Sequence, residues 1–332
     1  MIDESLKLLR ELRYDSGLFS AAKKNVKTGY DKAWIRDNIY CTFGLESYDN
    51  EDIVKTFQAL LDIFLKYEYK INYAIKHKPV HAYEYIHARY NPLTFQEYNE
   101  EWGNKQNDAV GAFLFKIAEL IDKDLKVIRN MNDLRIIQKL VFYLESIEYW
   151  HDKDNGIWEE NEEVHASSIG ACLAGLKAIS KHVYVPLSLI KNGEKALNKL
   201  LPRESETKDA DLALLSLIYP FNIMNKKQAM QVLENIEKNL AREKGVIRYL
   251  GDKYYNLNGL EAEWCFGFPW LAIIYKELGI MNKYYYYLQK SFECLTENYE
   301  MPELYFGNTD IYNENTPLGW GQSLLIVAVD RN

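Results

Sequence analysis

The sequence lacks the features that mark membrane proteins and small disulfide-stapled proteins. It contains no apolar run of eighteen residues or more, so no membrane span is expected. The four cysteines form no Cys-x-x-Cys, which excludes a zinc knuckle and a dithiol redox motif and predicts buried thiols. These cysteines are Cys41, Cys172, Cys265 and Cys294. At 332 residues the chain can bury a large apolar core without stabilisation by disulfide bonds.

The chain also lacks an excess of basic residues. The chain has 40 Lys and Arg against 48 Asp and Glu, a formal net charge of −8. Nucleic acid is not an expected partner, because phosphate binding depends on clustered cations that release counterions. The N-terminal Met-Ile-Asp-Glu-Ser carries acids where a secretory signal has a basic start and an apolar run, so we expect a cytoplasmic protein.

Several catalytic motifs are missing as well. There is no Gly-x-Ser-x-Gly, no glycine-rich phosphate loop and no His-Glu-x-x-His. His77 and His81 lie four residues apart, but nothing nearby supplies a clear set of further ligands, so we expect no metal site.

Helical spacing of apolar residues runs through most of the chain, which predicts an all-α fold. No linker rich in Pro, Ser or Gly and no charge block divides it, which favours a single domain over residues 1–332. The periodic segments predict twelve helices: 2–12, 35–46, 51–67, 107–122, 132–149, 165–180, 184–200, 209–218, 226–241, 264–279, 282–297 and 317–329. Long stretches without period separate some of them: 13–34, 68–106, 150–164, 242–263 and 298–316. Loops of this length in a compact domain are usually functional.

Aromatic residues are abundant, with 26 Tyr and 7 Trp. Their flat faces suit core packing and stacking on sugar rings equally well, so composition alone leaves the choice open. The polar and aromatic residues of the long stretches fall into five groups.

The first group contains Tyr30, Trp34, Arg36 and Asp37. Taken alone, a Trp beside Arg-Asp is more often a packed ring and an ion pair at a helix start. In a functional interpretation, Arg36 donates to the hydroxyls of a polyol while Asp37 accepts from them.

The second and third groups are Glu-Trp102-Gly103 and Ile-Trp-Glu159-Glu160. A capped helix and a solvated acidic face are the plainer interpretations of the two. Gly103 also permits a close backbone approach that leaves the indole of Trp102 at a cavity mouth. An apolar neighbourhood and a second carboxylate both disfavour ionisation, so one acid of the Glu159-Glu160 pair is expected to have a raised pKa. A carboxyl that keeps its proton near neutral pH can act as a general acid.

The fourth group begins at Gly245, contains Arg248 and continues to Glu263-Trp264, and the fifth contains Pro302-Glu303. A surface loop and a capping or paired acid are the plainer interpretations. Together the five groups supply carboxylates, Arg, Trp and Tyr, which is the inventory for acid/base chemistry on a neutral, hydroxyl-rich substrate.

In this order, the motifs resemble glycoside hydrolase family fifteen, the glucoamylase type, and the related phosphorylase kinase α and β subunits. The matching segments are Trp-Ile-Arg-Asp-Asn, Glu-Trp-Gly-x-x-Gln-x-Asp, Gly-Ile-Trp-Glu-Glu, Arg-Tyr-x-x-Asp-x-Tyr-Tyr and Pro-Glu followed by Pro-Leu-x-Trp-x-x-Ser. Each is weak alone, but five in register across about 300 residues make a specific pattern. The resemblance implies an (α/α)6 barrel whose long loops form a pocket at one end.

The resemblance also implies the roles of individual residues. Glu159 would be the general acid and Glu303 the general base of an inverting hydrolysis, with their carboxyls roughly 6.5–9.5 Å apart. Arg36 and Asp37 would hold the distal hydroxyls of the terminal sugar, which makes the enzyme exo-acting. Arg248 would bind hydroxyls on the other side of that sugar.

The resemblance implies roles for several further residues less directly. Glu160 resembles a residue that clamps substrate beyond the scissile bond, Trp102 one that packs near the acid, and Tyr30 one beneath the reacting ring. Trp34 belongs to the first matching motif. Glu263-Trp264 is a candidate pocket segment, with Pro269-Trp270 as a competing match.

The expected activity is release of glucose from the non-reducing end of malto- or isomalto-oligosaccharides or trehalose, with no cofactor or metal. The expected partner is a neutral oligosaccharide; nucleic acid and membrane are not expected, and the sequence leaves the oligomeric state open. The rival is a non-catalytic carbohydrate-sensing or scaffold domain, like that of the kinase subunits. A pure binder has no need for both Glu159 and Glu303, which weighs against that rival.

Overall fold

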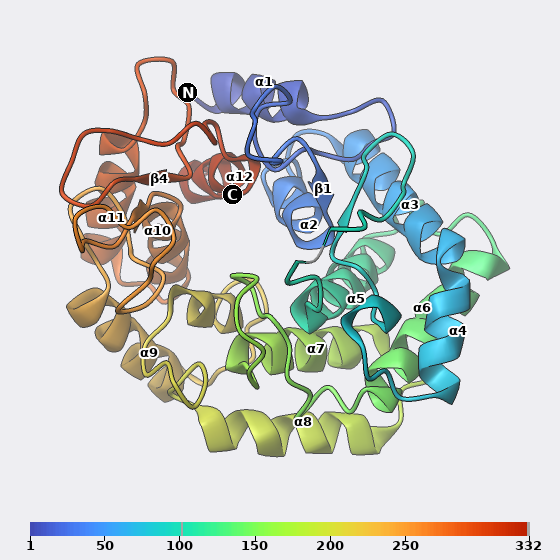
Figure 1. Cartoon of the computed structure of the whole chain (residues 1–332). Coiled ribbons are helices and arrows are strands. Elements are labelled where there is room, and N and C mark those ends of the chain that lie inside the picture. The colour runs from blue at the N-terminus through green and yellow to red at the C-terminus, as the bar shows by residue number, and fades with distance from the viewer. Residues whose placement is uncertain (101, 331–332) are drawn as a thin grey trace.

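Helices dominate the computed structural model, which describes residues 1–100 and 102–330. Six helical elements contact one another in a closed ring, and six more lie outside them (Figure 1). The inner ring consists of α2 (Ile35–Phe43), α5 (Asn107–Asp122), α7 (Ala166–Ile179), the 3₁₀ helix η2 (Leu212–Leu217), α10 (Gly267–Glu277) and α12 (Gly319–Val329). The outer ring consists of α1 (Ile2–Leu12), α3 (Asn50–Lys66), α6 (Met131–Ser146), α8 (Leu187–Leu200), α9 (Lys226–Asn239) and α11 (Met281–Glu293). Outer and inner elements alternate along the chain, which confirms the (α/α)6 barrel.

Burial separates the two rings. All nine residues of α2 are buried, as is α12 from Gly319 to Ile326. By contrast, α8 buries only Leu189, Gly193 and Leu197, whose four-residue spacing forms one stripe. A helix that is covered on all sides belongs in the core, whereas a single apolar stripe suits a helix with one face in solvent.

Two helical segments differ from the sequence-based prediction. The stretch 68–106 was expected to be a loop, but it contains α4 (Glu68–Lys76) and the short 3₁₀ helix η1 (Ala82–Glu84). Only Ile71 and Ala74 of α4 are buried, so its apolar stripe is too narrow to be recognised in the sequence. The predicted helix 209–218 is the 3₁₀ helix η2, whose continuation is limited because Pro220 disfavours helical backbone at the residue before it. The other predicted helices are present with shifted ends, and residue 264 lies in a strand rather than in α10.

Two short strand pairs tie distant loops together. β1 (Ala33–Trp34) pairs antiparallel with β2 (Arg89–Tyr90), and Trp34 lies opposite Arg89. β3 (Glu263–Trp264) pairs antiparallel with β4 (Leu304–Tyr305), and Trp264 lies opposite Leu304. Each ladder therefore joins loops that enter different inner helices.

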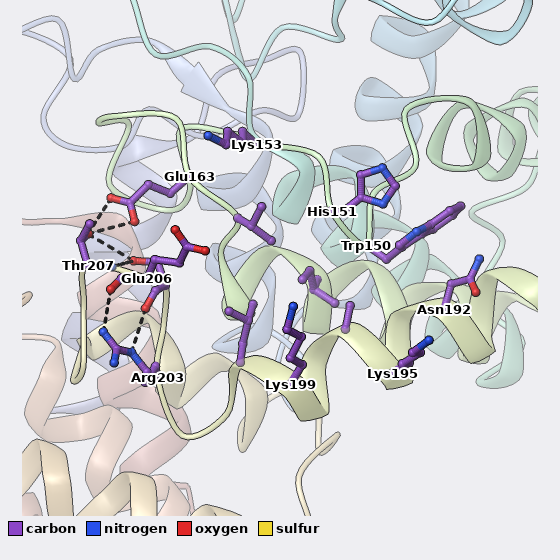
Figure 2. Close-up of a pocket in the computed structure, with 15 residues that line it drawn as sticks. Trp150, His151, Lys153, Glu163, Asn192, Lys195, Lys199, Arg203, Glu206 and Thr207 are labelled. Carbon is purple, nitrogen blue, oxygen red and sulfur yellow. Dashed lines mark hydrogen bonds between the residues drawn. The ribbon is translucent and has the colours of Figure 1, made fainter.

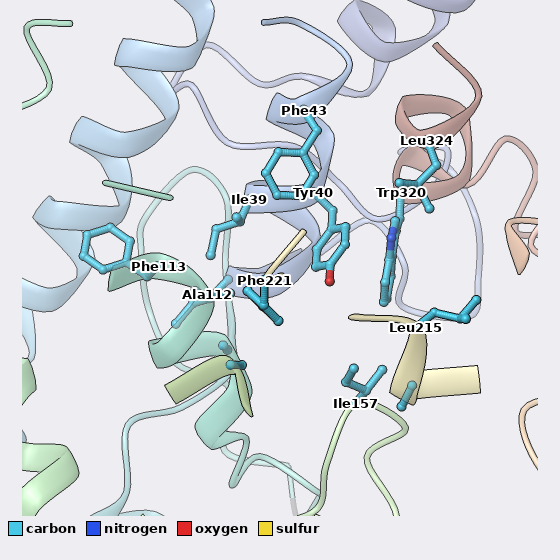
Figure 3. Packing of buried hydrophobic residues seen from close by; sticks show 14 of the residues in the cluster. Ile39, Tyr40, Phe43, Ala112, Phe113, Ile157, Leu215, Phe221, Trp320 and Leu324 are labelled. Atoms are coloured by element: carbon cyan, nitrogen blue, oxygen red, sulfur yellow. The ribbon is translucent and has the colours of Figure 1, made fainter. Parts of the chain in front are cut away.

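Buried aromatic and aliphatic side chains of the inner elements pack together in one cluster, in which Tyr40 and Trp320 lie near each other (Figure 3). The ring centroids of Tyr40 on α2 and Trp320 on α12 are 4.4 Å apart, and Trp320 also stacks on Phe266 at 4.8 Å. Ser323 of α12 donates to the Tyr40 carbonyl and accepts from the Gly44 amide. The last inner helix is thus joined to the first by ring packing and by hydrogen bonds.

The four cysteines are buried and free, as the sequence predicts. In the described part of the chain, no helix combines the length and the apolar character needed to cross a membrane.

Gly111 on α5 is expected to be intolerant of any side chain. A Cβ there would lie 2.3 Å from the Cys172 amide nitrogen of α7, and Gly175 of α7 faces the Gly111 carbonyl equally closely. Ala in place of Gly favours a helix by about 1 kcal/mol, but the clash here is with the backbone of α7, which cannot move aside as a flexible side chain can, so the overpacking cost lies at the upper end of the usual range, about 2–3 kcal/mol. We expect Gly111→Ala to lower the free energy of unfolding by about 1–2 kcal/mol, measured by urea denaturation; an unchanged or higher midpoint would contradict this tight helix contact.

Candidate active site

A cavity of about 290 Å³ lies where the loops from the outer helices enter the inner ones. Its walls come from the segments before α2, α5, α7, α10 and α12, and from the first turns of α2 and α12. The N-terminal end of a helix carries partial positive charge, so this end of the ring favours anionic side chains and hydroxyl oxygens. The lining residues are Ala21, Thr28, Tyr30, Trp34, Arg36, Asp37, Arg89, Trp102, Ile157, Trp158, Glu159, Arg248, Tyr254, Trp264, Phe266, Glu303, Leu318 and Trp320.

Nine of the ten site residues named from the sequence line this cavity. The exception is Glu160, whose carboxylate accepts hydrogen bonds from Arg248 at 2.7 Å and from Tyr249 and forms an ion pair with Lys208 at 3.4 Å. The structure therefore places Glu160 beside the cavity, as the anchor of Arg248. The Glu101 of the second motif lies outside the described residues.

Glu159 sits at the tip of a hairpin-like loop before α7. Asp154 and Glu163 pair at the base of the loop, and the Asn155 side chain donates to the Glu160 carbonyl at 2.6 Å. Glu159 itself has φ of 64°, in the left-handed region that is unfavourable for a residue with a Cβ. A local strain of this kind persists only where surrounding contacts fix it.

Gly103 makes one of the contacts that hold Glu159 in this conformation. A Cβ at this position would lie 2.5 Å from the Glu159 carbonyl oxygen. The loop before α5 therefore touches the backbone of Glu159 directly, which is possible only with glycine there. This contact gives a physical reason for the Trp-Gly motif beside the acidic pair.

Burial sets the charge state of Glu159. It raises the pKa of this carboxyl to about 7, and the neighbouring Asp37 adds to the rise, while Arg36 and Arg89 oppose it. The side chain of Glu159 is 22% exposed, so its carboxyl is accessible to a ligand bound in the cavity. Glu159 therefore holds a proton up to near neutral pH.

Glu303 precedes β4 on the other side and is fully buried. It accepts hydrogen bonds from Tyr30 at 2.7 Å, from Asn315 at 2.7 Å and from Asn313. Burial raises the pKa of Glu303, but all three donors favour its charged form and oppose that rise. Its carboxylate is thus oriented by neutral donors, with no direct ion pair among the described residues.

Arg36 and Asp37 occupy the first turn of α2. Arg36 forms an ion pair with Asp108 at 3.0 Å and donates to Gln106 at 2.8 Å, and its other nitrogen lies 3.5 Å from Glu159. Burial raises the pKa of Asp37 to about 6, and the charge of Arg36 opposes the rise. The pair lies at the cavity wall, where one member can donate to hydroxyl groups and the other can accept from them.

Two aromatic boxes enclose guanidinium groups at the cavity. Arg248 makes two hydrogen bonds of 2.6 Å to Asp252, and its Cζ lies 5.0 Å from the Trp264 ring centroid and 4.9 Å from that of Tyr254. Such bidentate pairs and ring contacts fix the orientation of the guanidinium. Arg248 is therefore held rigidly against the cavity wall.

The second box surrounds Arg89. Its Cζ lies 4.1 Å from the Trp102 ring centroid and 5.1 Å from that of Trp34, and it donates to Glu100. Trp34 also packs on Tyr30, with ring centroids 5.4 Å apart. The predicted aromatic residues Trp34, Trp102 and Tyr30 thus form one wall that runs from Arg89 to Glu303.

The structure also decides between two aromatic candidates. Trp264 lines the cavity, whereas Trp270 is fully buried in the core and donates to the Tyr219 carbonyl at 2.8 Å. Glu263 does not line the cavity; it accepts from the backbone amides of Lys244 at 2.6 Å and Asn308 at 3.0 Å, so it joins two loops.

Arg89 and Tyr254 are lining residues that the sequence-based site did not include. Tyr254 stands within the Arg-Tyr-x-x-Asp-x-Tyr-Tyr motif, which could have identified it. Arg89 has no comparable signal, because only the pairing of β2 with β1 brings it opposite Trp34.

Replacing Tyr30 by Phe should raise the pKa of Glu303 further, because it removes a hydroxyl that favours the carboxylate. Carbon-13 NMR titration of the glutamate carboxyls would measure the change. Tyr254→Phe is the matched control. The Tyr254 hydroxyl lies 3.1 Å from that of Tyr30 and, among the described residues, makes no hydrogen bond to Glu303, so we expect a smaller change in the pKa of Glu303. A pKa that falls, or that responds only to Tyr254→Phe, would contradict the assigned hydrogen bond.

Comparisons with known proteins agree with the fold that positions this cavity. A solved wild-type glycosidase superposes with a TM-score of 0.83 over 98% of this chain and 96% of its own, at 16% identity. The glucoamylase from Saccharomycopsis fibuligera superposes with a TM-score of 0.66 over 98% of this chain and 94% of its own, at 14% identity. At such identities these structures show the shared fold alone.

Sequence relatives add a second kind of protein. The probable phosphorylase b kinase regulatory subunit alpha of Caenorhabditis elegans is 26% identical over 89% of this chain, and the match covers 30% of that protein. The skeletal muscle isoform from Oryctolagus cuniculus is 28% identical over 68% of this chain and 21% of its own length. This chain therefore spans less than a third of these relatives. The family model described as glycosyl hydrolases family 15 matches residues 5–328, so the chain belongs to that family.

Proposed function

We propose that the chain is an inverting, exo-acting glycoside hydrolase that releases glucose from the non-reducing end of α-glucosides. One observation carries the proposal: two carboxyl groups with different environments line the same cavity. Glu159 keeps its proton up to about pH 7 because it is buried near Asp37. Glu303 faces three neutral donors that favour its charged form. Environments that differ in this way suit one acid and one base.

In the proposed reaction, Glu159 protonates the glycosidic oxygen as the bond to the anomeric carbon breaks. Glu303 takes a proton from a water molecule that attacks that carbon from the opposite face. The water oxygen becomes the new anomeric hydroxyl, and its configuration is inverted. Tyr30 and the two asparagines would hold Glu303 in the orientation that the water requires.

The shape of the cavity supports action on a terminal sugar. Its volume of about 290 Å³ is at the lower limit of small-molecule pockets. Arg36 and Asp37 lie at one wall and Arg248 at another, so hydroxyls of one sugar ring could be bound from two sides. The substrates proposed are malto- and isomalto-oligosaccharides and trehalose, which are neutral and rich in hydroxyls.

A second candidate function is a carbohydrate-binding regulatory domain without hydrolysis. The similarity to proteins named as regulatory subunits favours it. Both hypotheses expect sugar binding in the cavity, so only turnover separates them.

The deciding experiment incubates the protein with maltose, isomaltose, maltotriose and trehalose and follows the anomeric protons of freshly released glucose by NMR. Release of β-glucose supports the inverting hydrolase. On maltotriose, where the first glucose freed comes from the non-reducing end, release of the α-anomer would overturn inversion. Inversion on trehalose frees one α- and one β-glucose, and the reducing-end glucose of maltose and isomaltose is an anomeric mixture, so these sugars report cleavage only. Binding of glucose without release from any of the four sugars would favour the regulatory domain.

Glu159→Gln should lower kcat by about 10²–10⁴-fold, because it retains shape and hydrogen bonding but removes the general acid. Steady-state glucose release on the best of the four sugars measures the loss. Glu162→Gln, an exposed acid of the same loop outside the cavity, is the matched control and should keep wild-type turnover. Near-normal kcat in Glu159→Gln would contradict the acid assignment.

The rate should decline above about pH 7, since Glu159 must be protonated to act and its pKa is raised to about 7. It should also decline in acid, where Glu303 becomes protonated and no longer accepts a proton. Arg89→Gln should move the alkaline limb to higher pH, because the positive charge of Arg89 lowers the pKa of Glu159.

The pH profile of kcat/KM measures this shift, and Arg89→Lys is its control. Lysine keeps the positive charge, so its alkaline limb should stay closer to that of the wild type. An alkaline limb in Arg89→Gln that does not move, or moves to lower pH, would show that Arg89 does not influence the acid.

A further inference from the structure

A second concavity, of about 920 Å³, lies away from the catalytic cavity along α8 (Figure 2). Its walls are α8, Ile169 of α7 and the segments 150–153, 163–164 and 203–207. It shares no lining residue with the catalytic cavity. Its volume is at the upper end of the range for small-molecule sites.

One face of α8 forms the floor. Asn192, Lys195 and Lys199 recur every three or four residues, so their side chains project from the same side of the helix. Ala196 and Leu200 of the same helix also line the concavity, and the apolar surface continues over Trp150, Val164 and Ile169. The concavity is therefore lined by apolar surface with cationic groups along it.

Only some of the basic residues that line the concavity have an acidic partner. Arg203 pairs with Asp209 at 2.9 Å and donates to the Glu206 carbonyl at 2.6 Å. Among the described residues, Lys153, Lys195 and Lys199 form no ion pair.

The acidic groups lie at one end. The Thr207 hydroxyl donates to the Glu163 carboxylate and lies 2.8 and 2.9 Å from its two oxygens, and Glu206 lies beside Arg203 (Figure 2). Trp150, Lys195 and Asn192 lie toward the other end (Figure 2). Lys195 and Lys199 are four residues apart, where like charges repel unless an anion lies between them. In a chain of net charge −8, this unmatched positive charge marks the concavity as a site for an anion.

We propose that this concavity binds a phosphorylated small molecule. Its phosphate would be held by Lys195 and Lys199, and its ring would lie on Trp150 and the apolar floor. Charge-assisted hydrogen bonds to phosphate and stacking on an indole are the interactions that these residues offer. The ring that carries the phosphate could belong to a sugar phosphate or to a nucleotide. This proposal concerns binding alone and does not depend on hydrolysis in the catalytic cavity.

Isothermal titration calorimetry on the full chain, with inorganic phosphate, glucose 6-phosphate, ATP and glucose as separate probes, tests the proposal. We expect glucose 6-phosphate or ATP to bind one molecule per chain, more tightly than inorganic phosphate, and to weaken as NaCl is raised. Which of the two binds more tightly identifies the ring. If neither binds at millimolar concentration, or if inorganic phosphate binds as tightly as both, the proposal is overturned.

The double variant Lys195→Gln/Lys199→Gln locates the site. We expect it to bind the phosphorylated probe at least tenfold more weakly, with an unchanged melting temperature because both side chains are exposed. Lys191→Gln is the matched control, an exposed lysine of α8 that does not line the concavity, and it should bind as the wild type does. Equal affinity in the double variant and the control would place the ligand elsewhere and overturn the assignment.

Discussion

Loss of water around the carboxyl groups at the entrance to the inner ring is the constraint on which the site depends. Burial raises the pKa of both Asp37 and Glu159, and the positive charge of Arg36, which pairs with Asp108 and lies 3.5 Å from Glu159, opposes both rises. A buried charge without a partner is very costly, so each acid either keeps its proton or faces a donor. The protonation pattern that suits hydrolysis thus follows from burial and from the positions of a few arginines.

Glu303 meets the same constraint by another route. It is fully buried, yet its donors are a phenol and two amides rather than a direct cationic partner. Neutral donors stabilise the charged form less strongly than an ion pair would, which leaves the group able to accept a proton. The two acids of the proposed reaction therefore differ in their partners, although desolvation raises the pKa of both.

The barrel supplies the geometry that these charges need. Because outer and inner elements alternate, every inner element is entered by a loop from the outer ring, and five of these loops line the cavity. The two-residue ladders β1–β2 and β3–β4 then fix loops from opposite parts of the sequence. Helices provide the frame, while hydrogen bonds between loops determine the positions of side chains.

The sequence predicts the ring and most of the site because both depend on local patterns. Helical periodicity identified α5 over its full length, and the five motifs named nine residues that line the cavity. It could not predict Arg89, whose position depends on a strand pair formed with Trp34 more than fifty residues away. The anchoring of Glu160 by Arg248 and the contact between Gly103 and Glu159 likewise depend on loops that meet only in the folded chain. The carboxyl separation and the single domain expected from the sequence stay predictions.

The position of α12 has a consequence for how the molecule assembles. This final inner helix contacts both α2 and α10, and its Trp320 is part of the cavity wall. During synthesis, the barrel would therefore remain an open arc until α12, which begins at Gly319, has left the ribosome. The cavity wall and the ring would be completed in the same step, so a chain made only as far as Leu318 would have both Glu159 and Glu303 in its sequence but no closed cavity around them.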